Sequence, residues 1–471
     1  MNFKRKLWWA QHRTDVYKYS TIILLILVVA ISIIYFTHSK FSSSNEITMY
    51  ETTVEPFIKN DYFIASYIDG EWSNEIPGKN DGYAVDKVVC DNDAVGTWDN
   101  DTWSINISNA TKKIKCGVYF KKVTKLIEKI TNLSSVDTTN FAIDDPGNNI
   151  RYIGADPNNY VYFNCSDYSN QSDSTCEKWR IIGVFKNITK ADGTKENLVK
   201  IIRNDRLNNI NIRWDYKQTG VGTSITNYGS NDWTDSQLMM MLNPKDYLKS
   251  GYTIENNVVK DSYGQEIYQN MGSYYNGTSG CQPASITSGS SFSCTSIDFA
   301  STGLKNDLTR NAIEGIVWNL GGTATYNSTS TGLASHWYDY ERGTNVYSGH
   351  ATTWTGKIGL MYPSDYGYAT SGGSTTNRTS CLSTMLYYNG WNNVNDCYGN
   401  DYLFKAEYSQ WTLTPISSAA NGIFIVTLGN INRTNALNNN YSVHPSAYLK
   451  SNVLISNGEG TSASPYQLKL S

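Results

Sequence analysis

Charged side chains are scarce in this sequence: Asp, Glu, Lys and Arg make up 17% of its 471 residues, against about 25% in an average soluble protein. Histidine occurs five times and no C-x-x-C motif is present, which disfavours a structural zinc site. The sequence also lacks G-x-S-x-G, H-E-x-x-H and a phosphate-binding loop, the motifs of several hydrolase and nucleotide-dependent classes. Its net charge of −3 gives no basis for nucleic-acid binding.

What the sequence does contain is typical of a globular protein. Hydrophobic residues reach 40% and aromatic residues 13%, with 35 Tyr, which is ample material for buried cores. Polarity comes more from Asn, Ser, Thr, Gly and Tyr than from charge, and such surfaces suit hydrogen bonding and stacking with neutral ligands. The length predicts two to four domains.

An uncharged segment lies near the N-terminus, at Tyr19–Thr37. A helix of this length spans close to the ~30 Å hydrocarbon core of a membrane. Basic residues dominate the sequence before it: Lys4, Arg5, Lys6, Arg13 and Lys18, against Asp15 alone. The positive-inside rule then predicts a cytoplasmic tail at 1–18, a transmembrane anchor at 19–37 and a stalk at 38–60. We therefore expect a single-pass protein of the cell membrane whose bulk is extracellular.

Two alternatives for this segment remain. A cleaved signal peptide would need a small-x-small site after the apolar core, and Thr37–Ser44 is a poor one. A buried globular helix fits poorly with the length of the segment and with the asymmetry of its flanking charge.

The cysteines are even in number and fall into four sequence-neighbouring pairs: Cys90, Cys116, Cys165, Cys176, Cys281, Cys294, Cys381 and Cys397. Local pairing is the economical connectivity, although spacing by itself leaves other pairings open. Disulfides form in oxidising compartments. We therefore favour four disulfides over a catalytic thiol.

A small antiparallel β domain is predicted at 61–122. Polar and apolar residues alternate, as in half-buried strands, over Tyr62–Asp69, Tyr83–Cys90, Thr102–Ile107 and Ile114–Phe120. The next segment, Lys121–Leu133, has apolar residues at three- and four-residue spacing, which indicates a helix. We expect a helical linker over 123–144.

Three sequences in this region resemble a known module. They are Gly-Tyr-Ala-Val-Asp-Lys-Val-Val-Cys from Gly82, Gly-Thr-Trp-Asp-Asn-Asp-Thr-Trp-Ser-Ile from Gly96, and Lys-Cys-Gly-Val-Tyr-Phe from Lys115. Together they resemble a small β module found near the anchor of surface proteins from low-GC, gut-type bacteria. The resemblance is compatible with a spacer.

The remaining residues, 145–471, are predicted to form one large α+β domain with long loops. Helices are expected at Asp235–Leu242, capped by Thr234, and at Leu308–Leu320, ended by Gly321 and Gly322. Strands are expected at 160–163, 179–185, 198–203, 356–361, 411–415, 422–428, 442–449 and 453–455. Long polar loops intervene at 259–305 and 321–353, and loops of this length often carry function.

Several motifs in the same region resemble the C-type lectin-like fold. They are Trp-Arg-Ile-Ile-Gly-Val-Phe from Trp179, Trp-Thr-Asp-Ser-Gln-Leu-Met-Met-Met-Leu-Asn from Trp233, Trp-Thr-Gly-Lys-Ile-Gly-Leu-Met-Tyr-Pro-Ser-Asp-Tyr-Gly-Tyr-Ala from Trp354, Trp-Thr-Leu-Thr-Pro from Trp411 and Val-His-Pro-Ser-Ala-Tyr-Leu from Val443. They are most similar to the branch of formylglycine-generating-enzyme-like domains and uncharacterised bacterial surface domains. His444 stands where that pattern has Arg, which weakens any salt bridge the Arg makes. The fold hosts sugar binding, protein binding, phage receptor recognition and one oxidase chemistry, so function depends on the site.

The sequence favours recognition over catalysis. His336 adjoins Trp337, Asp339 and Glu341, so acid–base work is conceivable, but no nucleophile pattern accompanies it. We expect a membrane-anchored extracellular recognition protein, an adhesin or a carbohydrate- or protein-binding module, that is not an enzyme. The alternative is a surface hydrolase or other extracellular enzyme, which predicts carboxylates of raised pKa converging in a deep cleft.

The candidate ligand-binding residues combine aromatic rings with carbonyl and carboxylate oxygens: Tyr362, Asp365, Tyr366, Tyr368, Trp391, Asn392, Asn395 and Asp396. Trp391-Asn-Asn-Val-Asn-Asp-Cys is faintly similar to the Trp-Asn-Asp stretch of sugar-binding C-type lectins, and Asn and Asp oxygens suit calcium. The companion Glu-Pro-Asn motif is absent, which argues against a lectin-type calcium site. The expected partners are an extracellular glycan or protein and, through Tyr19–Thr37, the membrane.

Overall fold

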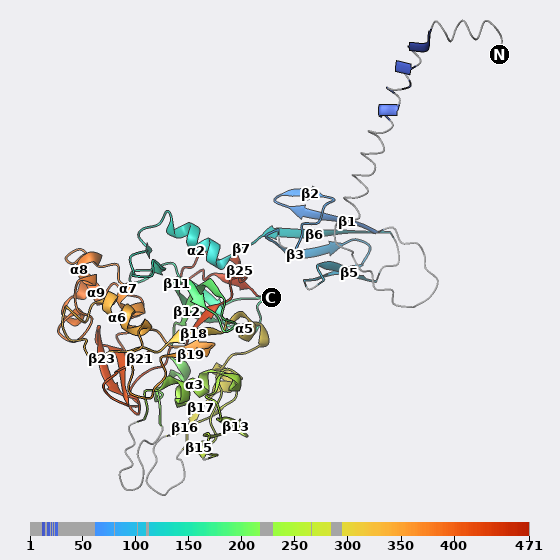
Figure 1. The fold of residues 1–471 in the computed structure, drawn as a ribbon. Coiled ribbons are helices and arrows are strands. Elements are labelled where there is room, and N and C mark those ends of the chain that lie inside the picture. Colours follow the sequence, from blue (N-terminus) through green and yellow to red (C-terminus); the bar gives the residue numbers. More distant parts are fainter. Residues whose placement is uncertain are drawn as a thin grey trace. The chain divides into compact units, whose positions relative to one another are not determined.

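The computed structural model describes residues 12–14, 17–18, 20, 22, 24–26, 62–79, 81–100, 102–109, 113–216, 229–264, 266–283 and 294–470. The chain divides into two compact units, Met1–Lys122 and Val123–Ser471. Figure 1 shows the elements of each unit.

The small unit is a β structure built on a four-stranded sheet in the order β2-β1-β6-β3. Its strands, with the separate hairpin β4–β5, are β1 (Tyr62–Ile68), β2 (Glu71–Ser73), β3 (Tyr83–Cys90), β4 (Val95–Asp99), β5 (Ser104–Ser108) and β6 (Ile114–Lys122). Alternate residues of β6 are buried, as period-two patterning requires. The predicted all-antiparallel sheet is wrong in one pairing, because β1 runs parallel to β6, with Tyr62 opposite Ile114.

The large unit is organised around a seven-stranded sheet in the order β20-β24-β12-β11-β9-β8, with β10 also paired to β11. Its strands are β8 (Phe141–Ala142), β9 (Ile150–Tyr152), β10 (Tyr160–Phe163), β11 (Glu177–Thr189), β12 (Lys195–Arg203), β20 (Ile358–Gly359) and β24 (Ser446–Leu449). The expected strands at 160–163, 179–185 and 198–203 are confirmed. The central strands β11 and β12 are rich in Ile and Val and almost wholly buried in their middle parts.

Smaller sheets and short helices complete the large unit. The additional strands are β7 (Thr124–Lys125), β13 (Thr253–Glu255), β14 (Val258–Lys260), β15 (Glu266–Tyr268), β16 (Gly280–Pro283), β17 (Cys294–Ile297), β18 (Ile316–Asn319), β19 (Thr353–Gly356), β21 (Gln410–Pro415), β22 (Gly422–Thr427), β23 (Asn430–Asn435), β25 (Leu454–Asn457) and β26 (Gln467–Lys469). The helices are α2 (Leu126–Ser134), α3 (Gln237–Leu242), α4 (Phe299–Thr302), α5 (Asp307–Ala312), α6 (Ala334–Arg342), α7 (Pro363–Tyr368), α8 (Arg378–Leu382) and α9 (Asn395–Tyr398), with 3-10 turns η1 (Leu207–Asn209), η3 (Trp233–Asp235), η4 (Lys245–Tyr247) and η5 (Trp391–Asn393).

The α+β prediction is wrong: the structure is mostly β, with 36% strand against 18% helix. The stretch Leu308–Leu320 illustrates the reason. Its helix, α5, ends at Ala312, and Ile316–Asn319 forms β18 by pairing with β19. Thr234 is also not the cap of α3: the side chain of Ser236 accepts from Met239 N.

The predicted transmembrane helix and single-pass localisation are corrected as well. In the described residues, no helix is both long enough and apolar enough to cross a membrane. Most of the predicted anchor, Tyr19–Thr37, and all of the predicted stalk at 38–60 lie outside the described residues.

The segment expected as a helical linker, 123–144, is packed into the large unit. Strand β7 pairs with β25 near the end of the chain. Leu126 and Ile130 of α2 are buried in the main core. Their burial follows from the apolar stripe that predicted the helix.

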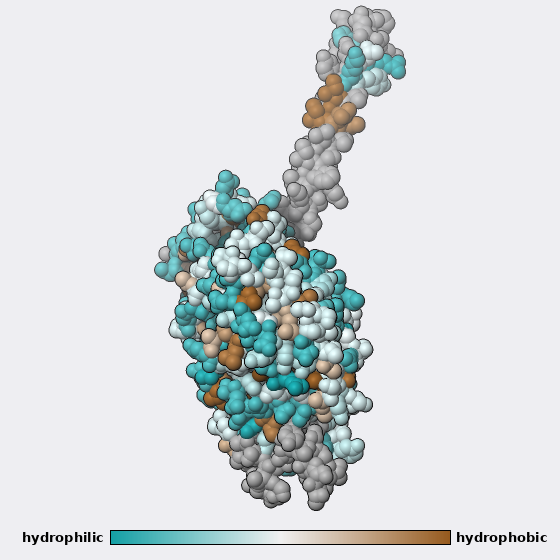
Figure 2. All heavy atoms as spheres, turned by 90° about the vertical axis from the view of Figure 1, so that its left-hand side faces the viewer, coloured by the Kyte–Doolittle hydropathy of each residue, from teal (hydrophilic) through white to brown (hydrophobic). Residues whose placement is uncertain are grey.

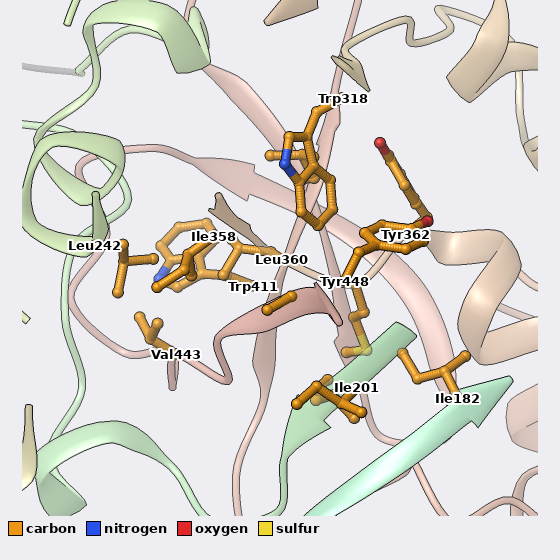
Figure 3. Close-up of a cluster of buried hydrophobic side chains, with 14 of the residues drawn as sticks. Ile182, Ile201, Leu242, Trp318, Ile358, Leu360, Tyr362, Trp411, Val443 and Tyr448 are labelled. Carbon is orange, nitrogen blue, oxygen red and sulfur yellow. The ribbon is translucent and has the colours of Figure 1, made fainter. Parts of the chain in front are cut away.

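One continuous core fills the large unit, with Trp, Tyr, Leu, Ile and Met side chains. Figure 3 shows part of it, with Ile182 of β11, Ile201 of β12, Tyr448 of β24 and Trp318 among the labelled side chains. On the face shown in Figure 2, hydrophobic residues of the folded units appear as single spots among hydrophilic and neutral ones. Scattered apolar residues of this kind are normal for protein surfaces.

The predicted local disulfides are confirmed: Cys90–Cys116, Cys165–Cys176, Cys281–Cys294 and Cys381–Cys397. The first joins β3 to β6 at directly opposite residues. Each bridge closes a short loop, which removes conformational entropy from the unfolded chain.

Candidate ligand-binding cleft

A cleft of about 230 Å³ opens on the large unit where the end of β11 approaches β18 and α6. Lys190, beyond the end of β11, forms a bridge to Ile316 at the start of β18. The lining residues are Asn149, Phe185, Lys186, Asn187, Ile188, Thr189, Ile316, Val317, Asn319, Tyr338, Arg342, Tyr362 and Tyr448.

Helix α6 supplies one wall. Leu333 N donates to His336 Nδ1 at 3.3 Å, which caps the first turn. Ala334, Trp337 and Glu341 are buried, and the Trp337 ring packs 4.6 Å from that of Phe424. Because that face of the helix is held in the core, Tyr338 and Arg342, four residues apart, lie together on the cleft side.

The Arg342 guanidinium is held in a fixed orientation. Its Cζ lies 3.3 Å from the centre of the Tyr338 ring. Its Nη1 donates to Tyr338 O at 3.0 Å and to Glu341 Oε2 at 3.2 Å. The Arg342 side chain is 25% exposed, whereas that of Glu341 is fully buried. The cleft therefore presents a planar cation that Tyr338 and Glu341 hold in place.

A buried charge network supports this wall. Ser364 N donates to Glu341 Oε1 at 2.8 Å, and Ser364 Oγ donates to Glu341 Oε2. The adjacent Asp365 accepts from Lys200 Nζ at 2.5 Å and from Arg151 Nη1 at 2.7 Å. Arg151 Nε also donates to Asp145 Oδ2 at 2.7 Å. The network joins β9, β12, α6 and α7, elements far apart in the sequence.

The two acids of this network differ in pKa. Burial raises the pKa of Glu341 to about 7, with the Arg342 charge acting in the opposite direction. Burial also acts to raise the pKa of Asp365, but Lys200 and then Arg151 hold it below its ordinary value. Glu341 therefore changes charge near neutral pH while Asp365 stays ionised.

Tyrosine and asparagine side chains form the floor. Tyr362 Oη donates to Asn319 O at 2.9 Å and accepts from Asn319 N at 3.2 Å. Asn149 Nδ2 donates to Tyr338 Oη at 3.3 Å, and its Oδ1 accepts from Lys186 N at 2.8 Å. Trp318 packs 5.3 Å from Tyr448, and Figure 3 shows both rings near Tyr362. These contacts make the floor rigid before a ligand arrives.

The structure buries five of the eight candidate ligand-binding residues. Tyr362, Asp365, Tyr366, Tyr368 and Trp391 are each at most 4% exposed. Of these, Tyr362 alone lines the cleft. Asp365 belongs to the ion network, and Trp391 Nε1 donates to Cys381 O at 3.0 Å. The side chains of these residues pack in the core and are not available to a ligand, because α7 and the turn at Trp391 face inward.

The other three candidates, Asn392, Asn395 and Asp396, lie outside this cleft. Asp396 Oδ2 accepts from Thr375 N and from Thr376 N, each at 2.6 Å, which together with the Thr375 hydroxyl lowers its pKa. Its carboxylate therefore holds a turn. In the part of the chain that the structure describes, no three His, Cys, Asp or Glu side chains gather as a metal site would require.

The motifs of the sequence do not point to Arg342, Tyr338, Asn319 or Lys186. The sequence does contain one signal for this wall of the cleft: Tyr338 and Arg342 are four residues apart, in the same segment as His336. His444, considered for its departure from the lectin-like pattern, is buried with Nδ1 3.0 Å from Arg203 O. Neither His336 nor His444 lines the cleft.

Comparison with known proteins adds no relative: no family model, no curated protein and no solved structure matches this chain.

Proposed function

We propose that this chain is a non-catalytic recognition protein that binds an extracellular ligand, in the first instance a glycan, through the cleft between β11, β18 and α6. The observation that carries the proposal is the composition of the cleft. Its described lining offers three Asn amides, three Tyr rings and two cations on a rigid floor, and it includes no Asp, Glu, His or Cys. The Asn187 and Asn319 amides and the Thr189 hydroxyl of this lining both donate and accept hydrogen bonds, which suits sugar hydroxyls.

The size of the cleft favours partial capture of a larger ligand. At about 230 Å³ it lies below the ~300–1,000 Å³ typical of sites that enclose a whole small molecule. One sugar ring or one side chain would fill it, while the rest of the ligand stayed outside. This is the geometry expected for recognition of a polymer or of a surface.

Two further features support the proposal. The four disulfides are typical of a protein that works in an oxidising environment such as the cell exterior. Glycans are common polymers at cell surfaces. The sequence resemblance of residues 145–471 to C-type lectin-like domains also favours recognition, because that fold hosts sugar binding and protein binding.

The competing hypothesis, an extracellular enzyme, predicts accessible carboxylates of raised pKa. Three carboxyls do have a raised pKa, mainly through burial: Asp215 at about 6, Glu341 at about 7, and Asp401, whose pKa lies well above its ordinary value. Asp215 accepts from Tyr268 Oη at 2.6 Å, Gln237 N at 3.0 Å and Ser230 N at 2.6 Å. Asp401 accepts from Leu403 N at 2.7 Å. Because all three groups are buried and held by hydrogen bonds, we assign them structural roles.

The test is binding of the full chain, purified with its disulfides intact, to a broad glycan array with and without calcium. The variant Asn319→Ala removes a cleft amide, and Asn395→Ala removes an exposed amide outside the cleft. We expect saturable binding to a restricted set of sugars that Asn319→Ala loses and Asn395→Ala keeps. Binding lost in Asn395→Ala alone would move the site to the 391–401 region. A folded sample that binds no glycan would refute the glycan proposal.

A further inference from the structure

We infer that the cleft recognises a carboxylate-bearing sugar, with Arg342 as the group that pairs with the carboxylate and Lys186 as a second cation. This inference rests on the proposed function and names the class of its ligand. It starts from the charge of the cleft. Lys186 and Arg342 are the charged residues of the described lining, and both are positive, although the whole chain carries −3. The cleft is thus a local cationic site on a mildly acidic protein.

The geometry of Arg342 favours a planar anion. Within the described residues, the hydrogen bonds of its guanidinium start from Nη1 and run to Tyr338 O and Glu341 Oε2. The edge formed by Nε and Nη2 carries the remaining donors. Stacking on Tyr338 fixes the plane of the group. A guanidinium edge pairs with a carboxylate through two parallel hydrogen bonds, which an uncharged group does not match. A sulfate ester can pair in the same way, but it is a weaker acceptor because its charge is spread over three oxygens.

The neighbours of Arg342 favour a sugar as the carrier of that carboxylate. Asn187, Asn319 and Thr189 also line the cleft, and their side chains offer neutral donors and acceptors within the same small volume. A uronic acid presents one carboxylate and several hydroxyls on a single ring, so it could use the cation and the neutral groups together. An acidic peptide side chain would use the cation and leave the amides to water.

Glu341 links this recognition to protonation. Its carboxyl faces Arg342 on its own helix and Ser364 on α7, with Asp365, Lys200 and Arg151 in the next layer and the Tyr362 ring nearby. While Glu341 is ionised, it neutralises part of the Arg342 charge. Once it is protonated, the full charge of Arg342 faces the cleft. An anion bound at Arg342 favours the protonated form of Glu341, so affinity should rise as pH falls through about 7, the pKa of Glu341.

The experiment compares three probes on the full, oxidised chain: a galacturonic acid oligomer, the neutral galactose oligomer of the same length, and a sulfated galactose oligomer. Calorimetry gives a Kd for each. Charge-assisted pairing predicts that the carboxylated oligomer binds about 10- to 100-fold more tightly than the neutral one. The carboxylated oligomer should also bind more tightly than the sulfated one, and its Kd should increase as pH rises through the pKa of Glu341.

Four variants assign the effect. Arg342→Gln should abolish the preference for the acidic oligomer, Arg342→Lys should reduce it, and Lys186→Gln should weaken it. Arg206→Gln is the matched control, because Arg206 also lies over a tyrosine ring, 5.2 Å from Tyr408, but outside the cleft. It should change nothing. Thermal unfolding of each variant shows that it is folded.

The outcomes separate the two proposals. Equal binding of acidic and neutral oligomers, unchanged in Arg342→Gln, would overturn the carboxylate inference and leave the recognition function standing. Tighter binding of the sulfated oligomer, unaffected by Arg342→Lys, would also overturn it, because charge without the planar fork would then suffice. No binding of any oligomer or of any array glycan would refute the recognition proposal itself.

Discussion

Arg342 and Tyr338 form a stacked pair on one face of α6, with the guanidinium carbon 3.3 Å from the ring centre. Arg342 also donates to the backbone carbonyl of Tyr338. The pair therefore depends on both the helix and the ring. It is the feature that turns a flexible Arg side chain into an oriented donor.

The first prediction concerns this ring. Tyr338→Ala should lower the free energy of unfolding by about 1–2 kcal/mol, since it removes a cation–π contact and apolar packing. Tyr338→Phe keeps the ring and loses only the hydrogen bond from Asn149, so its loss should stay at or below ~1 kcal/mol. Urea unfolding measures both. Equal losses in the two variants would show that the hydroxyl, and not the ring, carries the stabilisation.

The second prediction concerns pH. The pKa of Glu341 is raised from 4.5 to about 7 in the folded chain. Between these values the native state holds more protons than the unfolded state, so this group's contribution to stability falls as pH rises from about 4.5 to about 7. At about 1.4 kcal/mol per pKa unit, the total is about 3 kcal/mol.

The variant Glu341→Gln isolates this contribution, because Gln keeps the shape and does not titrate. The stability of Glu341→Gln relative to the wild type should therefore increase as pH rises from about 4.5 to about 7. The measurement is the difference in free energy of unfolding between the two proteins at several pH values. A difference that does not vary with pH would contradict the raised pKa.

The third prediction compares a buried ion pair with a surface one. Lys200→Met leaves the fully buried Asp365 with Arg151 as its cation and Tyr362 N as a neutral donor, and breaking such a pair costs about 3–5 kcal/mol. Lys178→Met removes the partner of Asp173, whose side chain is 68% exposed, and should cost about 1 kcal/mol or less. Denaturant unfolding of both variants checks the contrast. Similar costs would mean that Arg151 fully compensates for the loss of Lys200.

The fourth prediction concerns the disulfides. Replacing Cys381 and Cys397 by Ala opens a loop of sequence separation 16 and should cost about 3 kcal/mol. Both residues are fully buried, so lost packing adds to this cost. Replacing Cys281 and Cys294, at separation 13, should cost less, because Cys294 is exposed. Calorimetric melting temperatures of the two double variants test the order.

The strands of the two units show what local sequence can predict. Alternation in Ile114–Phe120 and apolar runs in Trp179–Phe185 mark strands because each side chain's face depends only on its position along the strand. The same rule does not choose the partner strand. The parallel pairing of β1 with β6 joins residues fifty or so positions apart in the sequence, a choice that depends on global packing.

The wrong helix at Leu308–Leu320 has the same origin. Apolar residues recur there at a spacing that suits a helix, and α5 does form from Asp307 to Ala312. Beyond it, Ile316 and Trp318 alternate with Val317 and Asn319, and pairing with β19 makes this stretch a strand. Tertiary pairing overrides a short local preference.

The sequence by itself indicated the local cysteine pairing and the main strands of both units, because each depends on near neighbours in the chain. Only the tertiary structure decided the cleft. Asn149, Asn319 and Arg342 come from distant parts of the chain and meet where β11, β18 and α6 converge. The tertiary structure also decided that Tyr366 and Trp391 are buried. An aromatic side chain can pack in a core or bind a ligand, and the local sequence does not distinguish the two.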